Sequence, residues 1–220
     1  MKKKLLSYLE RFITEERKER FLEIIAQRTN HFTVAMEDVF QMHNTSAVVR
    51  TCEVFGVQQA HSIEGRFGKR LDAKIAMGAQ KWVDVFRYND TQSCIDTLRT
   101  QGYQIVATTP HKDAYFLNDF DITKKSAFFF GTEKEGLSTQ VLSKADTFLK
   151  IPMVGFTESL NISVAVAIVL QQLTDKLRRS EIAWQLSDEE RLNTLIHWTK
   201  QSIRNVNDVL TRYEEIKDTL

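Results

Sequence analysis

Strands and helices alternate along the middle of this chain, and that alternation constrains the fold more than any other feature of the sequence. Short β-rich runs occur at residues 32–39, 57–64, 82–88, 103–109, 126–131 and 147–152. Helix-length segments lie between most of them, at residues 45–56, 71–80, 91–102 and 136–145. Such alternation is typical of a mainly parallel sheet with helices on both faces. We therefore predict an α/β core.

The two ends of the chain have helical patterns instead. Apolar residues recur at helical spacing through residues 5–25, and Ser187 with Glu190 fits a capping box that starts a C-terminal helix. An apolar stripe follows that box at Leu192, Leu195, Ile196 and Ile203. We therefore predict an N-terminal helical extension at 1–30, a core at 31–175 and a C-terminal helical extension at 176–220.

The composition argues for a soluble protein without a metal site. Cys52 and Cys94 lack CxxC spacing, and the five histidines are scattered without a metal-ligand pattern. Glu10 and Arg11 interrupt the first apolar stretch too early for a signal peptide. The apolar run at 164–170 is too short to span a membrane. We expect a cytoplasmic protein with no membrane partner.

Positive charge is concentrated in clusters although the formal net charge is only +1. Residues 66–81 carry five Lys or Arg against one acid, and residues 1–20 carry seven against four Glu. A further cluster is Lys176, Arg178 and Arg179. Solvated helix faces would explain any one cluster, but several in a nearly neutral chain favour a polyanionic partner. We predict that this partner contacts residues within these clusters and at the start of the first core helix: Arg11, His43, Arg66, Lys69, Arg70 and Arg178.

Three polar segments follow predicted strands, where ligands bind in open α/β sheets. They are "HNTSAVVRT" at 43–51, "GTEKEGLS" at 131–138 and "IPMVGFTESLNIS" at 151–163. Each alone could be an ordinary loop with a helix N-cap, formed by Asn44 or Thr45 in the first segment and by Ser159 or Asn161 in the third. The nucleotide-binding patterns GxGxxG and GxxxxGK[ST] are absent.

Taken in order, the three segments resemble the signature motifs of the SpoU/TrmH family of RNA ribose methyltransferases, which belongs to the knotted SPOUT class. The resemblance covers roughly residues 5–200, and it implies a C-terminal trefoil knot at about 128–172. It also implies S-adenosylmethionine as cofactor and 2′-O-methylation of a ribose. The helical ends are similar to those of members that act on guanosine 18 of the tRNA D-loop.

The resemblance also implies roles for individual residues. Arg50 would stabilise the reacting 2′-oxygen, while Asn44, Glu133, Ser159 and Asn161 would complete the catalytic set. The cofactor would lie against Thr108, Gly131, Ile151 and Leu160. Glu158 departs from the family pattern, in which Gln or a small residue is more frequent.

Family members pair through the knot, so a homodimer is expected, with Arg50 approaching the partner's cofactor site. Part of the apolar surface for this contact is expected from Phe156, Val166 and Leu170. Two alternatives stay open. The protein could methylate ribosomal RNA, or it could bind RNA without catalysis.

Overall fold

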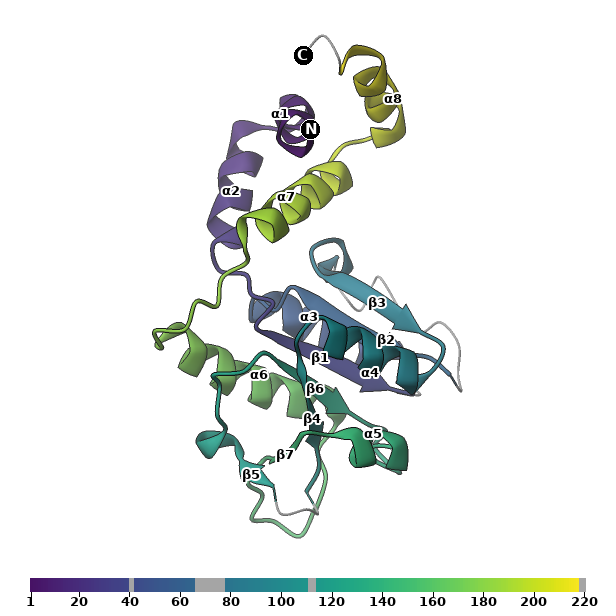
Figure 1. The fold of residues 1–220 in the computed structure, drawn as a ribbon, viewed down its shortest axis with the longest axis vertical. Helices are drawn as coiled ribbons and strands as arrows, with labels where there is room; N and C mark the ends of the chain where they lie inside the picture. Colours follow the sequence, from purple (N-terminus) through teal and green to yellow (C-terminus); the bar gives the residue numbers. More distant parts are fainter. Residues whose placement is uncertain (40–41, 66–77, 111–113, 218–220) are drawn as a thin grey trace. The chain divides into compact units, whose positions relative to one another are not determined.

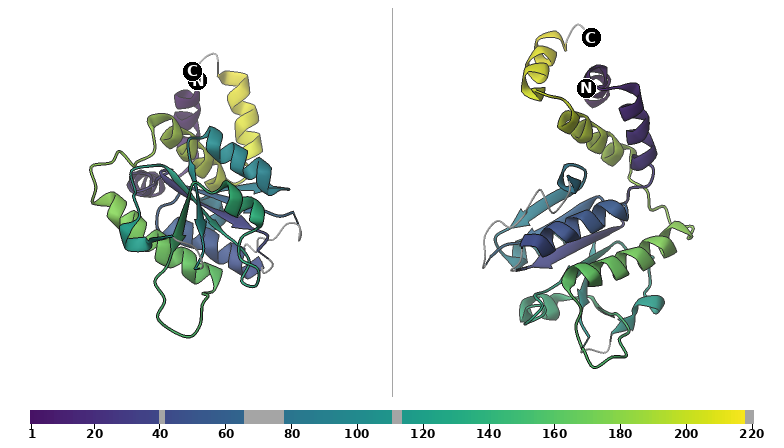
Figure 2. Two further views of the ribbon diagram at one scale, coloured as in Figure 1. Left: turned by 60° about the horizontal axis from the view of Figure 1, so that its bottom comes forward. Right: turned by 180° about the vertical axis from the view of Figure 1, so that it is seen from behind.

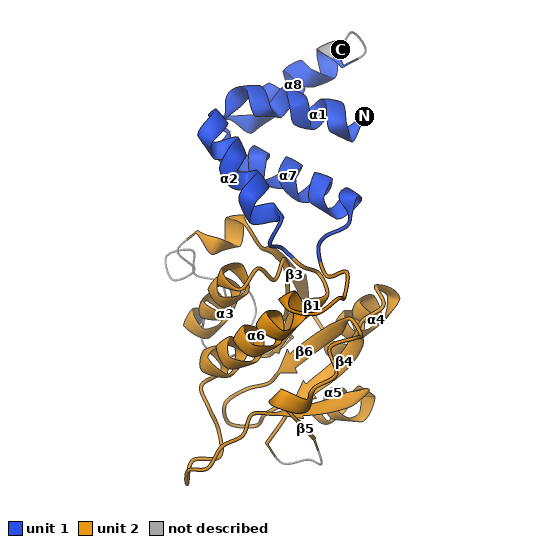
Figure 3. Ribbon diagram, turned by 90° about the vertical axis from the view of Figure 1, so that its left-hand side faces the viewer, with its two compact units in different colours: residues 1–28, 185–220 blue, residues 29–184 orange. Residues whose placement is uncertain are grey.

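The structure, a computed structural model, describes residues 1–39, 42–65, 78–110 and 114–217. The chain divides into two compact units (Figure 3). We call Thr29–Trp184 the sheet unit, and Met1–Arg28 with Gln185–Leu220 the helical unit. The helix predicted at 71–80 falls mostly outside the described residues.

The described part of the sheet unit contains one seven-stranded sheet in the order β3-β2-β1-β6-β4-β7-β5, and every pair of neighbours is parallel (Figure 1). The parallel α/β prediction is therefore confirmed. Only the short β5 was not predicted. The strands are β1 (Phe32–Glu37), β2 (Gln59–Ile63), β3 (Asp84–Tyr88), β4 (Gln104–Thr108), β5 (Tyr115–Phe116), β6 (Ser126–Phe130) and β7 (Thr147–Lys150).

Helices cover both faces of this sheet, as predicted. Val34 and Met36 of β1 belong to a buried cluster with residues of α3 (Met42–Val54) and α6 (Ile162–Arg178). Ala35, between them, belongs to a second cluster with residues of α4 (Thr91–Thr100) and α5 (Thr139–Lys144). Successive side chains of a strand point to opposite faces, so apolar residues at consecutive positions bury both. The right-hand view of Figure 2, in which the molecule is seen from behind, shows α3 and α6 side by side on one face of the sheet.

Most of the helix ends that were compared lie where the sequence predicts them. Gly56 and Gly102 adopt positive φ angles of 77° and 82° directly after α3 and α4, as expected of glycines that end helices. Asn161 is the N-cap of α6, and its Oδ1 accepts from the Ser163 amide at 2.9 Å. The alternative interpretation of Asn44 or Thr45 as an N-cap is wrong, because both residues lie within α3, which spans Met42–Val54.

The helical unit has a small core of its own. Its helices are α1 (Lys2–Leu9), α2 (Glu15–Ile25), α7 (Asp188–Ser202) and α8 (Val206–Ile216). The predicted capping box of α7 is present, with Ser187 and Glu190 bonded to each other's backbone. Ile196 of the predicted stripe packs with Leu9 and Tyr213, which places both chain ends in one unit.

Short 3₁₀ turns complete the fold at η1 (Glu10–Phe12), η2 (Ala79–Lys81) and η3 (Leu117–Asp119).

Candidate active site

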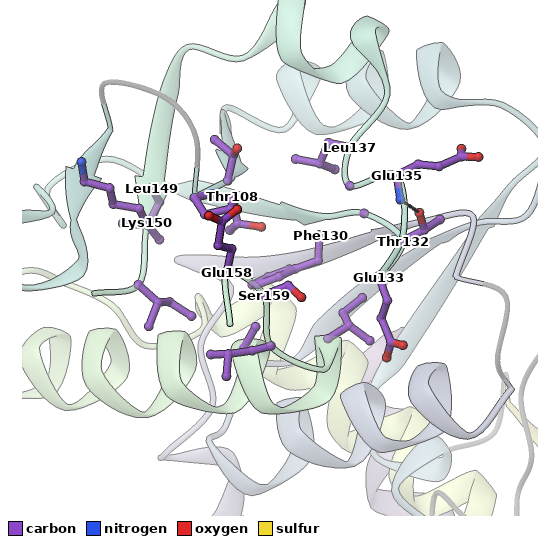
Figure 4. Close-up of a pocket in the computed structure, with 18 of the residues that line it drawn as sticks. Thr108, Phe130, Thr132, Glu133, Glu135, Leu137, Leu149, Lys150, Glu158 and Ser159 are labelled. Atoms are coloured by element: carbon purple, nitrogen blue, oxygen red, sulfur yellow. Dashed lines mark hydrogen bonds between the residues drawn. The ribbon is translucent and has the colours of Figure 1, made fainter. Parts of the chain in front are cut away.

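A cavity of about 500 Å³ opens at the carboxyl ends of β4, β6 and β7 (Figure 4). Thr108 ends β4, Gly131 follows β6, and Ile151 follows β7, so consecutive neighbours in the sheet each contribute one wall. Leu160 closes the cavity from the segment before α6. The four residues predicted to bind the cofactor therefore line one cavity.

The 131–138 loop forms a wall of this cavity and is closed by its own backbone. Thr132 and Gly136 exchange two backbone hydrogen bonds of 3.0 Å, and the Thr132 hydroxyl accepts from the Glu135 amide at 3.0 Å (Figure 4). A Cβ on Gly131 would lie 2.0 Å from the Gly136 carbonyl oxygen. Only glycine leaves room for this close approach of two backbone segments.

Polar side chains from the three predicted motifs meet at one point. Asn44 donates from Nδ2 to Oε1 of Glu133 at 3.1 Å. Asn161 donates from Nδ2 to the same Oε1 at 2.7 Å and to Asn44 Oδ1 at 3.1 Å. Figure 4 shows Glu133 pointing away from Glu135, on the opposite side of the loop. We call Asn44, Glu133 and Asn161 the polar triangle.

Asn44 is buried, and the triangle gives it partners that an apolar surrounding would not provide. The two amides have fixed orientations, because each Asn presents a donor to an acceptor within the triangle. The hydrogen bonds of the triangle link α3, the 131–138 loop and the start of α6. The hydrogen bonds explain why Asn44, Glu133 and Asn161, which are far apart in the sequence, carry an amide, a carboxylate and a second amide.

Ser159 and Glu158 also line the cavity. In Figure 4 the Glu158 carboxylate is directed toward Thr108. Glu158 belongs in addition to the wall of a neighbouring cavity of about 380 Å³, which it shares with Lys150 and Phe116. The Lys150 ammonium lies 4.3 Å from the centre of the Phe116 ring.

Arg50 and His43 lie on α3, the helix that carries Asn44, and Arg50 is exposed. Among the described residues, the Arg50 guanidinium has no hydrogen-bond or ion-pair partner. Arg50 lies six residues after Asn44, about 9 Å along the axis of this helix, and its permanently charged group is available to an anion or to developing negative charge.

The predicted RNA contacts have varied surroundings. Arg11 is exposed in the helical unit, with its guanidinium 6.0 Å from the centre of the Tyr8 ring. Arg178 is half-buried, donates to the Phe55 carbonyl oxygen at 2.7 Å and lies over the Trp184 ring. Burial lowers the pKa of Arg178 from its ordinary value. Arg66, Lys69 and Arg70 lie outside the described residues.

Sequence reasoning missed several residues around the cavity. Leu137 and Leu149 give it apolar walls, and Glu37 accepts three hydrogen bonds at the end of β1. Leu149 and Glu37 occupy strand ends at the carboxyl edge, and that position was the signal that could have identified them. Glu37 is in addition the acidic residue that ends the otherwise apolar or neutral run "FTVAM".

The expected apolar contact surface needs a correction. Val166 and Leu170 are buried in the core against the sheet, whereas Phe156 is fully exposed. The exposed large apolar residues of α6 are Val164 and Ile168, two residues away from those predicted, and Val154 before the helix is fully exposed as well. The error was one of helix face, because a continuous apolar run does not reveal which side is buried.

The described residues contain no group of three or more His, Cys, Asp or Glu side chains that could hold a metal ion. Within the same ranges, every helix is too short or too polar to cross a membrane.

The chain is similar to proteins of known family. The family described as SpoU rRNA Methylase matches residues 31–171. The tRNA (guanosine(18)-2'-O)-methyltransferase of Borreliella burgdorferi is 41% identical over 202 residues, which cover 92% of this chain and 93% of the relative. The enzyme of the same name from Thermus thermophilus is 36% identical over 180 residues, covering 82% and 91%.

Among solved structures, the A. aeolicus TrmH/SpoU tRNA modifying enzyme aligns with a TM-score of 0.76 at 30% identity. The alignment covers 87% of this chain and 98% of that one. The three motifs, the parallel sheet and the matched family agree, and the chain belongs to the SpoU rRNA methylase family.

Proposed function

We propose that this protein transfers a methyl group from S-adenosylmethionine to the ribose 2′-hydroxyl of guanosine 18 in tRNA. The names of its relatives support this reaction. The observation that carries the proposal is the polar triangle, in which Asn44, Glu133 and Asn161 meet beside a cavity large enough for a small-molecule cofactor.

The residues around the cavity fit the cofactor. Its apolar walls, Leu137 and Leu149, suit an adenine ring, and exposed backbone at the strand ends offers hydrogen bonds. The missing Cβ of Gly131 keeps the 131–138 loop compact at the cavity wall. Thr108, Gly131, Ile151 and Leu160 would hold the cofactor. When bound, it supplies an electrophilic methyl group on a sulfonium.

The chain's own residues have to position a ribose and stabilise charge on its oxygen. A guanidinium is permanently protonated and is a poor base, so Arg50 acts electrostatically, holding the ribose 2′-oxygen or an adjacent phosphate. Asn44, Glu133 and Asn161 fix the surrounding backbone, and Ser159 faces the cavity. Preorganised positioning of this kind supplies much of the rate in a direct displacement.

A second copy of the chain would complete the site. Val154, Phe156, Val164 and Ile168 are exposed apolar residues next to the cavity walls, and a homodimer would cover them. The same region, about 128–172, would form the trefoil knot. The exposed guanidinium of Arg50 would then approach the partner's cofactor cavity.

RNA would contact the helical extensions and the basic clusters. In this proposal residues 31–175 are the methyltransferase core, and 1–30 and 176–220 are the extensions. Arg11, His43, Arg66, Lys69 and Arg70 would bind phosphates. Arg178 is the least available, because its guanidinium already donates to Phe55. Action on tRNA fits a cytoplasmic protein.

The proposal is tested with labelled S-adenosylmethionine and tRNA transcripts that differ only at position 18. Guanosine 18 should accept the label, and 2′-deoxyguanosine 18 should not, because it lacks the acceptor oxygen. Label in ribosomal RNA but not in tRNA would identify the ribosomal alternative. RNA binding without label in either RNA would identify a catalytically silent relative.

A further inference from the structure

Glu37 is a buried carboxylate outside the cavity and outside the polar triangle. It ends β1 and is only 4% exposed. Its Oε1 accepts from the hydroxyls of Thr91 and Ser138, each at 2.7 Å, and its Oε2 accepts from the Ser138 amide at 2.8 Å. A buried carboxylate is costly unless it is hydrogen-bonded, and these three contacts satisfy it.

The partners of Glu37 lie at the starts of two helices. Thr91 is the first residue of α4, and Ser138 is the N-cap of α5, where its hydroxyl accepts from the Val141 amide at 3.3 Å. Ser138 is also the last residue of the 131–138 loop. The carboxylate therefore holds that end of the loop against the end of β1.

The other end of the loop is held by the sheet. Phe130, the last residue of β6, is in register with Met36, which precedes Glu37 in β1. Between these two fixed ends, the Thr132–Gly136 backbone bridge leaves the loop little freedom. Glu133 projects from this loop to the polar triangle.

The chain that leads to the first polar segment, 43–51, also starts at Glu37. Asp38 follows it with a φ of 50°, an uncommon angle for a residue other than glycine, and its amide donates to the Ile63 carbonyl at 3.1 Å. The chain then continues toward α3 and Asn44. Asn44 and Glu133, which hydrogen-bond to each other, thus belong to two segments that start beside one carboxylate.

We propose that Glu37 is a positioning residue for methyl transfer, which fixes the base of the 131–138 loop and thereby the distance between Glu133 and Asn44. This inference rests on the proposed function. The positioning role depends on the hydrogen bonds of Glu37 and not on its charge. Glutamine could keep all three contacts, because its oxygen would accept from the Ser138 amide and its NH₂ would donate to the two hydroxyls. Leucine has a similar volume and could keep none of them.

The experiment compares Glu37→Gln and Glu37→Leu by steady-state methylation of tRNA, with each rate divided by the folded fraction. Glu37→Leu should lower kcat about 100-fold, in the range seen when preorganisation is lost, while KM for tRNA changes less than about threefold. Glu37→Gln should keep kcat within about fivefold of the wild type.

A matched control separates positioning from general stability. Leu177→Ala removes a buried side chain in the last turn of α6, away from the cavity walls, and should lower the unfolding temperature without lowering kcat per folded molecule. The inference is overturned if Glu37→Leu keeps its kcat, if Glu37→Gln falls as far as Glu37→Leu, or if Leu177→Ala loses kcat to the same extent. A wild-type protein that does not methylate tRNA would contradict the proposed function instead.

Discussion

The two loops that line the cavity are built in opposite ways. The 131–138 loop is closed by a backbone bridge, has one buried leucine and is bonded to Glu37 at its end. The 151–161 loop has none of these three features. Within the described residues, positions 152–160 form no hydrogen bonds, and nearly all of them are exposed. Asn161 alone joins that loop to the polar triangle.

This difference indicates which half of the site the chain completes by itself. Exposed backbone without internal hydrogen bonds has low local stability, so ligands or partners readily reorganise it. The apolar side chains at the tip of the 151–161 loop, Val154 and Phe156, are fully exposed. We infer that the 131–138 loop is ready before binding, while the 151–161 loop would become ordered when the cofactor and the proposed second copy bind.

The largest expected effect comes from a residue in neither loop. If both loops serve only to bind and orient, Arg50→Ala should lower kcat about 1,000-fold, because it removes the positive charge near the reacting oxygen. Cofactor affinity and the unfolding temperature should stay close to the wild-type values. Single-turnover methylation and calorimetry measure these quantities. Near-normal turnover would remove Arg50 from the mechanism.

A pair of glycine substitutions tests the comparison directly. Gly131→Ala should weaken cofactor binding about 100-fold or more, because its Cβ would lie 2.0 Å from the Gly136 oxygen and force the loop apart. Gly155→Ala is the matched control in the other loop, where the nearest atom lies 4.0 Å away, and it should change affinity less than about threefold. Calorimetry with S-adenosylmethionine measures both, and equal effects would remove the distinction.

A smaller effect is expected at the tip of the 151–161 loop. Phe156→Asp should weaken self-association about tenfold or more, because it places a charge in the apolar surface that a second copy would cover. Leu22→Asp, at an exposed apolar position of α2 in the helical unit, is the control and should leave association unchanged. Sedimentation over a range of concentrations measures the dimer affinity. A wild-type protein that is monomeric at micromolar concentration would contradict the dimer.

The smallest effect is expected from a basic residue that belongs to neither loop. Arg11→Ala should weaken tRNA binding a few-fold and reduce its salt slope by about one, as expected for the loss of one phosphate contact. Neutralising Arg66, Lys69 and Arg70 together should also weaken tRNA binding and reduce its salt slope, and by more than Arg11→Ala does. Salt titrations of tRNA binding, with cofactor affinity measured alongside, provide the data. An unchanged slope in both variants would mean that these charges only face solvent.

The sequence predicted the strands well because buried parallel strands are continuous apolar runs between recognisable turns. The four residues that the resemblance assigned to the cofactor, Thr108, Gly131, Ile151 and Leu160, also lie together in the wall of one cavity. The sequence-based prediction failed where two faces of one helix are both apolar, as at Val164 and Val166. It also missed Glu37, because the partners of a buried carboxylate are distant in sequence and appear only when the chain is folded.

Hydrogen exchange of the two loops tests the central claim most directly. In the free protein, the amides of Thr132, Gly136 and Ser138 should be protected, because each donates within the structure, while those at 153–160 should exchange at nearly unprotected rates. Adding S-adenosylhomocysteine should slow exchange at 153–160 and change the 131–138 loop little. Equal exchange in both loops of the free protein would contradict the account.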